Sequence, residues 1–130
     1  MNMNSAMNEY KKAGVHAEVM DADPHRLIQM LMEGALERIS IAKGAMQQKN
    51  VALKGDRISS AISIIEGLRA SLNMEAGGEI SANLENMYDY MTRRLMEANL
   101  KDDEQMLDEV ADLMRKIKSG WDEIPNNLEH

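Results

Sequence analysis

The hydrophobic positions of this chain fall into four stripes with the spacing of amphipathic helices. In such a helix, apolar residues recur every three or four positions and therefore share one face. No strand-like alternation separates the stripes, so the sequence predicts an all-α chain. The members of the stripes are Ile28, Met32, Ala35, Ile39, Ala42 and Met46; Ile58, Ala61, Ile65, Leu68 and Leu72; Ile80, Leu84, Met87, Met91, Leu95 and Ala98; and Leu107, Val110, Met114, Ile117 and Trp121.

Residues that start or stop helices lie at the ends of these stripes. Asp23 before Pro24 predicts the first helix start, because an N-cap carboxylate accepts backbone N–H groups and proline fits the first turn. Gly77-Gly78 separates the second stripe from the third, since paired glycines readily form a left-handed turn. Asp102, three residues ahead of a glutamine, has the spacing of a capping box and predicts the start of the fourth helix.

Short connections between amphipathic helices make neighbours antiparallel, and the stripes can be buried only against each other. We therefore predict an antiparallel up-down four-helix bundle over residues 21–127. Residues 6–19 are loosely helical, but Gly14 interrupts them and they are too short for a stable helix alone. Residues 1–20 are therefore either a short N-terminal capping segment or a frayed terminus. Residues 128–130 resemble the start of a vector-encoded histidine tag.

The apolar composition is unusual, with 13 methionines, one tryptophan and no phenylalanine. Methionine side chains are unbranched and polarizable, so a surface rich in them can repack around partners of different shapes. The alternative is that these methionines fill irregular gaps in the core. Both interpretations remain open at this point.

Charge and hydropathy restrict the partners and the compartment. A net charge of −7 and a pI of about 4.9 predict no nucleic-acid or anionic-membrane partner, because both would be repelled. No apolar run approaches the roughly 18 residues of a membrane span, so no membrane insertion is expected. The first residues lack a basic region and an apolar core typical of signal peptides, and the chain has no cysteine. These features favour a cytoplasmic protein.

Residue types that carry catalysis are nearly absent. Dinuclear metal centres in helical bundles use Glu-x-x-His motifs on paired helices, and the sequence has none. Its histidines are His16, His25 and His130, and we expect His25, in the first turn of a helix, to be a solvated surface group. No thiol nucleophile and no phosphate-binding glycine loop is present. The sequence therefore predicts a protein that is not an enzyme and that has no metal site or cofactor.

An ordered set of motifs extends from about Tyr10 to Ile124. It consists of Tyr10, residues 23–31 (DPHRLIQML), Gly34-Ala35-Leu36, residues 77–80 (GGEI), Asn83-Leu84, residues 88–91 (YDYM) and Arg94-Leu95. This set resembles the FliS family of flagellin-specific export chaperones. Met32 lies where that family commonly carries an aromatic residue.

The resemblance implies a four-helix bundle that acts as a cytoplasmic chaperone. Such a chaperone binds the disordered C-terminal segment of flagellin, prevents its premature polymerisation and helps to deliver it to the flagellar type III export gate. Components of that gate are therefore further candidate partners. In this family the N-terminal segment can cap a hydrophobic groove and is displaced by flagellin, and the matching positions here are Met7 and Tyr10.

This kind of recognition uses a groove between helices. A client that is disordered on its own becomes ordered as its apolar face enters that groove. Gly34, in mid-helix, indicates either close helix packing or space for a client side chain. Tyr88 and Tyr90 face different sides of their helix, so at most one is fully buried with the stripe. The candidate partner-binding residues are Met7, Tyr10, Leu27, Leu31, Met32, Gly34, Tyr88, Met91 and Leu95.

Two alternatives accompany this interpretation. Leu31 and Leu95 fit a role in the core as well as a role in the groove. The chain as a whole could instead be a self-associating helical adaptor, whose methionine-rich stripe is buried against a second copy and which has no flagellin client.

Overall fold

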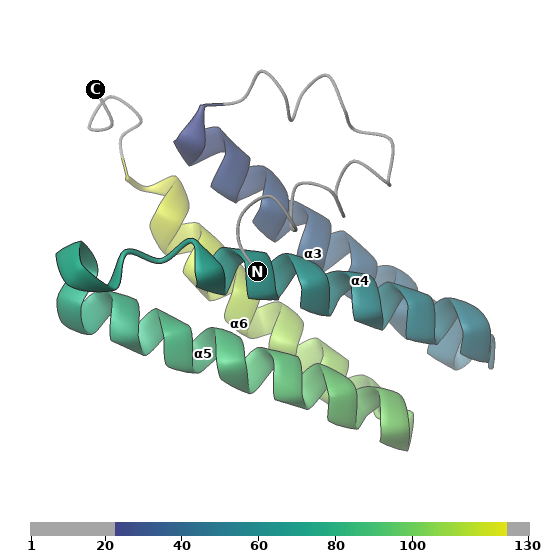
Figure 1. The fold of residues 1–130 in the computed structure, drawn as a ribbon. Coiled ribbons are helices and arrows are strands. Elements are labelled where there is room, and N and C mark those ends of the chain that lie inside the picture. Colours follow the sequence, from purple (N-terminus) through teal and green to yellow (C-terminus); the bar gives the residue numbers. More distant parts are fainter. Residues whose placement is uncertain (1–22, 125–130) are drawn as a thin grey trace.

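The computed structural model describes residues 23–124, apart from the side chains of residues 74–76, and Figure 1 shows their arrangement. The helices of this part are α3 (Pro24–Gln47), α4 (Val51–Ala70), α5 (Met74–Lys101) and α6 (Glu104–Asp122). Each helix packs against the next in the chain, and α6 packs back against α3. The four packing pairs close a ring around a common core, which confirms the predicted four-helix bundle.

Contacts between helix ends show that neighbouring helices run in opposite directions. The ammonium of Lys54, near the start of α4, donates to the carbonyl of Asn99, near the end of α5, at 3.0 Å. The ring of His25, at the start of α3, bonds to the carbonyl of Trp121, at the end of α6, at 3.0 Å. Both contacts require antiparallel neighbours, as expected for an up-down bundle with short connections.

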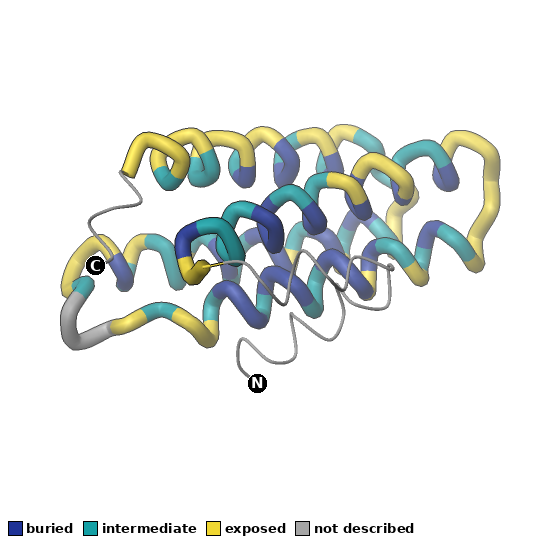
Figure 2. The backbone as a smooth tube through the Cα atoms, turned by 90° about the horizontal axis from the view of Figure 1, so that it is seen from above, coloured by how far each residue is buried: buried dark blue, intermediate teal, exposed yellow. Residues whose placement is uncertain are grey.

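The core is formed where the apolar stripes of the four helices meet, and Figure 2 shows buried positions on the inward side of each helix. Its fully buried side chains include Leu31, Ile65, Leu95 and Leu107. Burying a side chain of this size contributes about 1.5–3 kcal/mol relative to leaving it in water. The core-filling interpretation of methionine holds for a set of buried residues: Met30, Met32, Met46, Met91 and Met114.

The caps of α3 and α6 test the predicted helix starts. Asp23 caps α3, and its carboxylate accepts the N–H of Arg26 at 2.7 Å, as predicted. The prediction for α6 was wrong by one residue, because the N-cap is Asp103, which accepts the second and third N–H groups of the helix at 2.9 and 3.2 Å. Asp102 has a φ of 50°, and its carboxylate binds the buried ammonium of Lys54 instead. It is therefore not available for capping.

The glycine pair lies within α5 rather than before it. Helical turns begin at Met74, and Gly78 then interrupts them with a φ of 53° and a ψ of −125°. The left-handed turn predicted for this pair is thus present at Gly78. Gly77 is required for a different reason, because a Cβ atom there would overlap the side chain of Ser81.

Candidate partner-binding pocket

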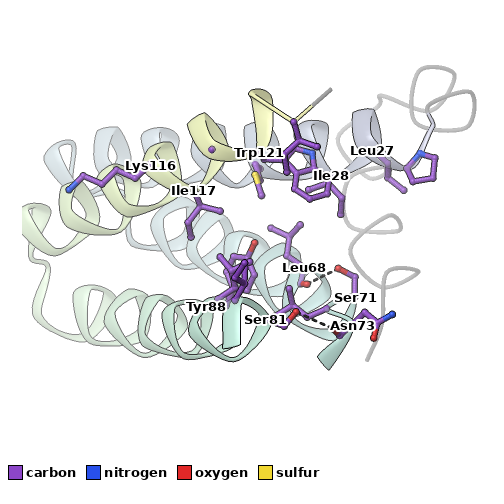
Figure 3. Close-up of a pocket in the computed structure, with 17 residues that line it drawn as sticks. Leu27, Ile28, Leu68, Ser71, Asn73, Ser81, Tyr88, Lys116, Ile117 and Trp121 are labelled. Carbon is purple, nitrogen blue, oxygen red and sulfur yellow. Dashed lines mark hydrogen bonds between the residues drawn. The ribbon is translucent and has the colours of Figure 1, made fainter. Parts of the chain in front are cut away.

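An apolar pocket of about 800 Å³ lies at one end of the bundle, where α3 and α5 begin and α4 and α6 end (Figure 3). All four helices contribute to it. Its apolar lining consists of Pro24, Leu27, Ile28, Met32, Leu68, Leu72, Ile80, Leu84, Tyr88, Ile117, Trp121 and Ile124. The remaining lining residues are Ser71, Asn73, Ser81, Lys116 and Gly120. The pocket is within the size range of binding clefts, about 300–1,000 Å³.

The candidate residues from the sequence fall into three groups, of which the first lines the pocket. Leu27, Met32 and Tyr88 are in this group. Leu27 is half-buried at its wall, whereas Met32 and Tyr88 are 2% and 3% exposed. The structure therefore brings together candidates from α3 and α5, which are separated by more than 50 positions in the chain.

The second group of candidates is buried away from the pocket. Leu31, Met91 and Leu95 are core residues with no exposed surface, and they are not among the lining residues. Gly34 is also buried and does not line the pocket. The third group, Met7 and Tyr10, lies outside the described residues, as do the rest of the predicted capping segment and residues 128–130.

Most of the apolar lining residues of the pocket belong to the stripes that the sequence pattern assigns to the core. Ile80 was placed in the third stripe, yet it is 73% exposed, because it follows the kink at Gly78 and lies at the rim of the pocket. Ile117 and Trp121 belong to the fourth stripe but are only partly buried. Their position in the stripes could have indicated their place in the pocket. Both lie near the end of the fourth stripe, and in an antiparallel bundle this end lies beside the start of the third stripe, which contains Ile80.

The two serine hydroxyls of the lining are engaged within the protein. The hydroxyl of Ser71 donates to the carbonyl of Leu68 at 2.7 Å, and the hydroxyl of Ser81 donates to the carbonyl of Asn73 at 3.0 Å (Figure 3). These two hydroxyl protons are therefore not available to a ligand. Because the other walls are mainly hydrocarbon, the pocket is suited to apolar side chains rather than to a polar small molecule.

His25 and Trp121 form a reciprocal contact beside the pocket. The Nε2 atom of His25 bonds to the carbonyl oxygen of Trp121, and the indole N–H of Trp121 donates to the carbonyl of His25, each at 3.0 Å. The two rings stack with centroids 5.0 Å apart. The prediction that His25 is a solvated surface group was wrong, since it is 4% exposed. We call this pair the His25–Trp121 clasp, because it holds the end of α6 against the start of α3.

Ion pairs reinforce the same end of the α3–α6 interface. Gln29 donates to the carboxylate of Asp122 at 2.8 Å, and Lys118 donates to Asp122 at 2.7 Å. The hydrogen bond from Lys118 lowers the pKa of Asp122, and the same bond raises the pKa of Lys118. Lys118 also lies 3.6 Å from the carboxylate of Glu33 on α3. This network is exposed to solvent, so it positions α6 more than it stabilises the fold.

The two tyrosines of α5 face different environments, as predicted. Tyr88 is buried, and burial raises the pKa of its phenol to about 12. Tyr90 is only partly buried and donates its hydroxyl to Glu109 of α6 at 2.7 Å. That hydrogen bond is the largest cause that lowers the pKa of Glu109. Only Tyr88 therefore belongs to the pocket.

Gly34 lies beside a buried cation between α3 and α4. The guanidinium of Arg38 donates to the carbonyl of Gly34 at 3.1 Å and to the hydroxyl of Ser60 at 2.6 Å. All three residues are buried. The arrangement favours the close-packing interpretation of Gly34 over a role in contacting a client.

Residues 23–124 contain neither a cluster of metal ligands nor a membrane-spanning helix. No group of three side chains among histidine, aspartate and glutamate is placed to hold a metal ion in this part of the chain. Within the same range, no helix combines the length and the hydropathy needed to cross a membrane.

Known proteins resemble this chain over nearly its whole length. The family model described as "Flagellar protein FliS" matches residues 6–128. The flagellar secretion chaperone FliS of Vibrio cholerae is 47% identical over 123 residues, which cover 95% of this chain and 90% of that protein. FliSB of Pseudomonas aeruginosa is 50% identical over 119 residues, or 92% of this chain and 94% of that protein. FliS of Salmonella typhimurium is 44% identical over 121 residues, with 92% and 90% covered.

Proposed function

The chain belongs to the FliS family of flagellar secretion chaperones, and from that premise we propose that it is a cytoplasmic export chaperone for flagellin. Its client is the disordered C-terminal segment of flagellin, which it holds in the apolar pocket. By covering this segment it prevents premature polymerisation, and it then assists delivery to the flagellar type III export gate. Components of the gate are its second class of partner.

The observation that carries this proposal is the open apolar pocket. A segment that is disordered alone cannot bury enough apolar surface to offset the entropy of ordering. The pocket supplies the missing surface, because side chains from four helices line it and Ile80 remains 73% exposed at its rim. Contiguous apolar surface of this kind is typical of a protein-interaction site.

The N-terminal segment is proposed as a cap for this pocket in the absence of the client. Met7 and Tyr10 are the residues that would enter it, although neither belongs to the part described by the structure. Flagellin would then displace residues 1–20 as it binds. Removing this segment should therefore increase the affinity for the client, because competition within the chain is lost.

The proposal is tested by calorimetric titration of the chaperone with the C-terminal segment of flagellin. We expect saturable binding, and we expect binding to weaken as the segment is truncated from its C-terminus. Ile80→Glu should reduce the affinity at least about tenfold, because it places a charge at the apolar rim. Leu100→Glu is the matched control, since Leu100 is on the same helix, is 85% exposed and does not line the pocket.

Two results would contradict the proposal. One is the absence of binding to wild-type protein. The other is an equal loss of affinity in Ile80→Glu and Leu100→Glu, which would place the client elsewhere. The self-associating adaptor predicts a stable oligomer in analytical ultracentrifugation and indifference to the flagellin segment, so sedimentation with and without the segment distinguishes the two functions.

A further inference from the structure

We propose that the end of α5 farthest from the pocket is a contact surface for a second copy of this chain, so that two chaperones pair weakly and reversibly with their pockets directed apart. This inference does not depend on the identity of the client. It is carried by exposed apolar side chains at this end of the bundle and by flanking charges that are complementary to those of a second copy.

Three exposed apolar side chains lie where the end of α5 meets the start of α4. Leu100 is 85% exposed, Met96, one turn earlier on α5, is 51% exposed, and Val51, the first residue of α4, is 70% exposed. The hydrogen bond from Lys54 to the carbonyl of Asn99 shows that these two helix ends are adjacent. None of the three apolar residues lines the pocket, which lies at the opposite end of the bundle (Figure 1). Exposed apolar side chains grouped in this way are typical of a protein contact.

Charged residues flank this apolar group with a spacing that is the same in both chain directions. Arg93, Met96, Leu100 and Asp103 follow one another at intervals of three, four and three positions. The first three share one face of α5, because residues three or four apart are neighbours on a helix, and Asp103 comes just after the end of α5 at Lys101. When a second copy lies antiparallel to the first, Arg93 meets Asp103 of that copy and Met96 meets its Leu100. Each contact then occurs twice, as in a two-fold symmetric dimer.

Both charged groups retain hydrogen-bonding capacity for this contact. Arg93 is 63% exposed and, within the described residues, donates through Nε alone, to Asp89 at 3.0 Å. Its two terminal NH₂ groups therefore remain for a carboxylate. Asp103 caps α6 through Oδ1, which accepts both N–H groups, so its Oδ2 atom can accept from the guanidinium of a second copy. The pair forms without breaking a bond that the single chain makes.

The size of the surface indicates a weak dimer. Stable interfaces use about 20–30 residues from each partner, whereas this surface is centred on a few exposed apolar and charged side chains. The net charge of −7 also makes two copies repel each other at long range. The contact therefore differs from the stable oligomer expected of a self-associating adaptor, and it leaves the pocket of each copy open to a client.

Charge reversal tests the pairing, with the full chain in sedimentation-velocity experiments over about 10 μM to 1 mM. Wild-type protein should sediment faster as its concentration rises. Arg93→Glu should weaken association at least about tenfold, because each dimer then contains a repulsive pair twice. Arg115→Glu is the matched control and should change association less than about twofold. Arg115 is also 63% exposed and also pairs within its own helix, with Asp112.

A mixture of two variants shows whether the charges meet across the contact. Asp103→Lys should associate as poorly alone as Arg93→Glu does, but the two variants mixed should pair to within about threefold of the wild-type affinity. In that mixed dimer one ion pair is native and the other has exchanged its charges. Circular-dichroism melts of each variant verify folding, since Asp103→Lys removes the cap of α6. A mixture that associates no more than its components would overturn the pairing.

Single cysteines test the antiparallel register without changing any charge. The chain has no cysteine of its own, so Met96→Cys and Leu100→Cys each introduce one thiol. With oxidised glutathione as the oxidant, the mixed disulfide should form at least about fivefold faster than either variant forms one with itself. The reason is that positions 96 and 100 face each other, whereas identical positions are offset by four residues, or about 6 Å along the axis.

Three results would overturn the inference and leave the proposed function intact. The first is wild-type protein that remains monomeric up to about 1 mM. The second is an equal loss of association in Arg93→Glu and Arg115→Glu, which would reflect the total charge rather than a specific pair. The third is equal rates of mixed and self disulfide formation in the cysteine variants, which would contradict the antiparallel register.

Discussion

Replacing His25 by alanine should destabilise the bundle specifically at its pocket end. The ring of His25 is 4% exposed, bonds through Nε2 to the carbonyl of Trp121 at 3.0 Å and stacks on the indole at 5.0 Å. The hydrogen bond contributes about 0.5–1.5 kcal/mol and the ring pair about 0.5–1.5 kcal/mol. The carbonyl of Trp121 retains a second bond, from the N–H of Ile124 at 3.1 Å, so it is not left unpaired. We therefore expect a loss of about 1–3 kcal/mol in the free energy of unfolding.

Urea denaturation followed by intrinsic fluorescence measures this loss. Trp121 is the single tryptophan of the chain, so its emission reports on the clasp itself. His25→Phe is the matched control, because it keeps an aromatic ring against the indole and removes only the hydrogen bond. It should cost about 1 kcal/mol.

A loss below about 0.5 kcal/mol in His25→Ala would refute the reasoning, since surface substitutions usually fall within that range. The same conclusion would follow if His25→Ala and His25→Phe were equally destabilised, because the ring contact would then contribute nothing.

Three further predictions concern the interior. Burial raises the pKa of Tyr88 to about 12, so its neutral form stabilises the fold below pH 10 and this contribution is lost as the pH rises toward 12. By pH 11, the free energy of unfolding of wild-type protein should fall by about 1.4 kcal/mol more than that of Tyr88→Phe. Parallel profiles of unfolding free energy against pH for the two proteins would contradict this prediction. Ser60→Ala removes a hydrogen bond from the buried Arg38 and should lower the free energy of unfolding by about 1.5–3 kcal/mol in urea, whereas an unchanged midpoint would show that the bond is dispensable. Gly34→Leu should lower the free energy of unfolding by about 1–3 kcal/mol through overpacking and leave the client affinity of the folded variant unchanged. Unchanged stability in thermal melts together with weaker client binding in calorimetry would favour the client-contact interpretation.

Much of the fold could be predicted from the sequence, because helix signals are local. The stripes arise from residues three or four positions apart, and the cap at Asp23 involves a bond to a residue three positions away. The error at the start of α6 arose from two adjacent aspartates. Which one caps depends on Lys54, whose ammonium binds Asp102 from 48 positions earlier in the chain.

The pocket was less accessible to sequence reasoning, because it depends on where four helices diverge. Apolar periodicity predicts which face of a helix points inward, but it does not tell whether the facing side chains fill the space at the end of a bundle. Ile80 and Ile117 therefore had the same signature as core residues. His25 was misplaced for a related reason, since its partner Trp121 is 96 positions away and only the folded bundle brings the two together.

The central claim, that the client of this chaperone occupies the apolar pocket, is tested most directly by the accessibility of Trp121 to acrylamide. The indole lines the pocket and is only partly buried, so a bound segment should cover it. Adding saturating C-terminal flagellin segment should lower the quenching constant and shift the emission to shorter wavelength. Unchanged quenching and emission, under conditions where calorimetry shows saturated binding, would contradict the account.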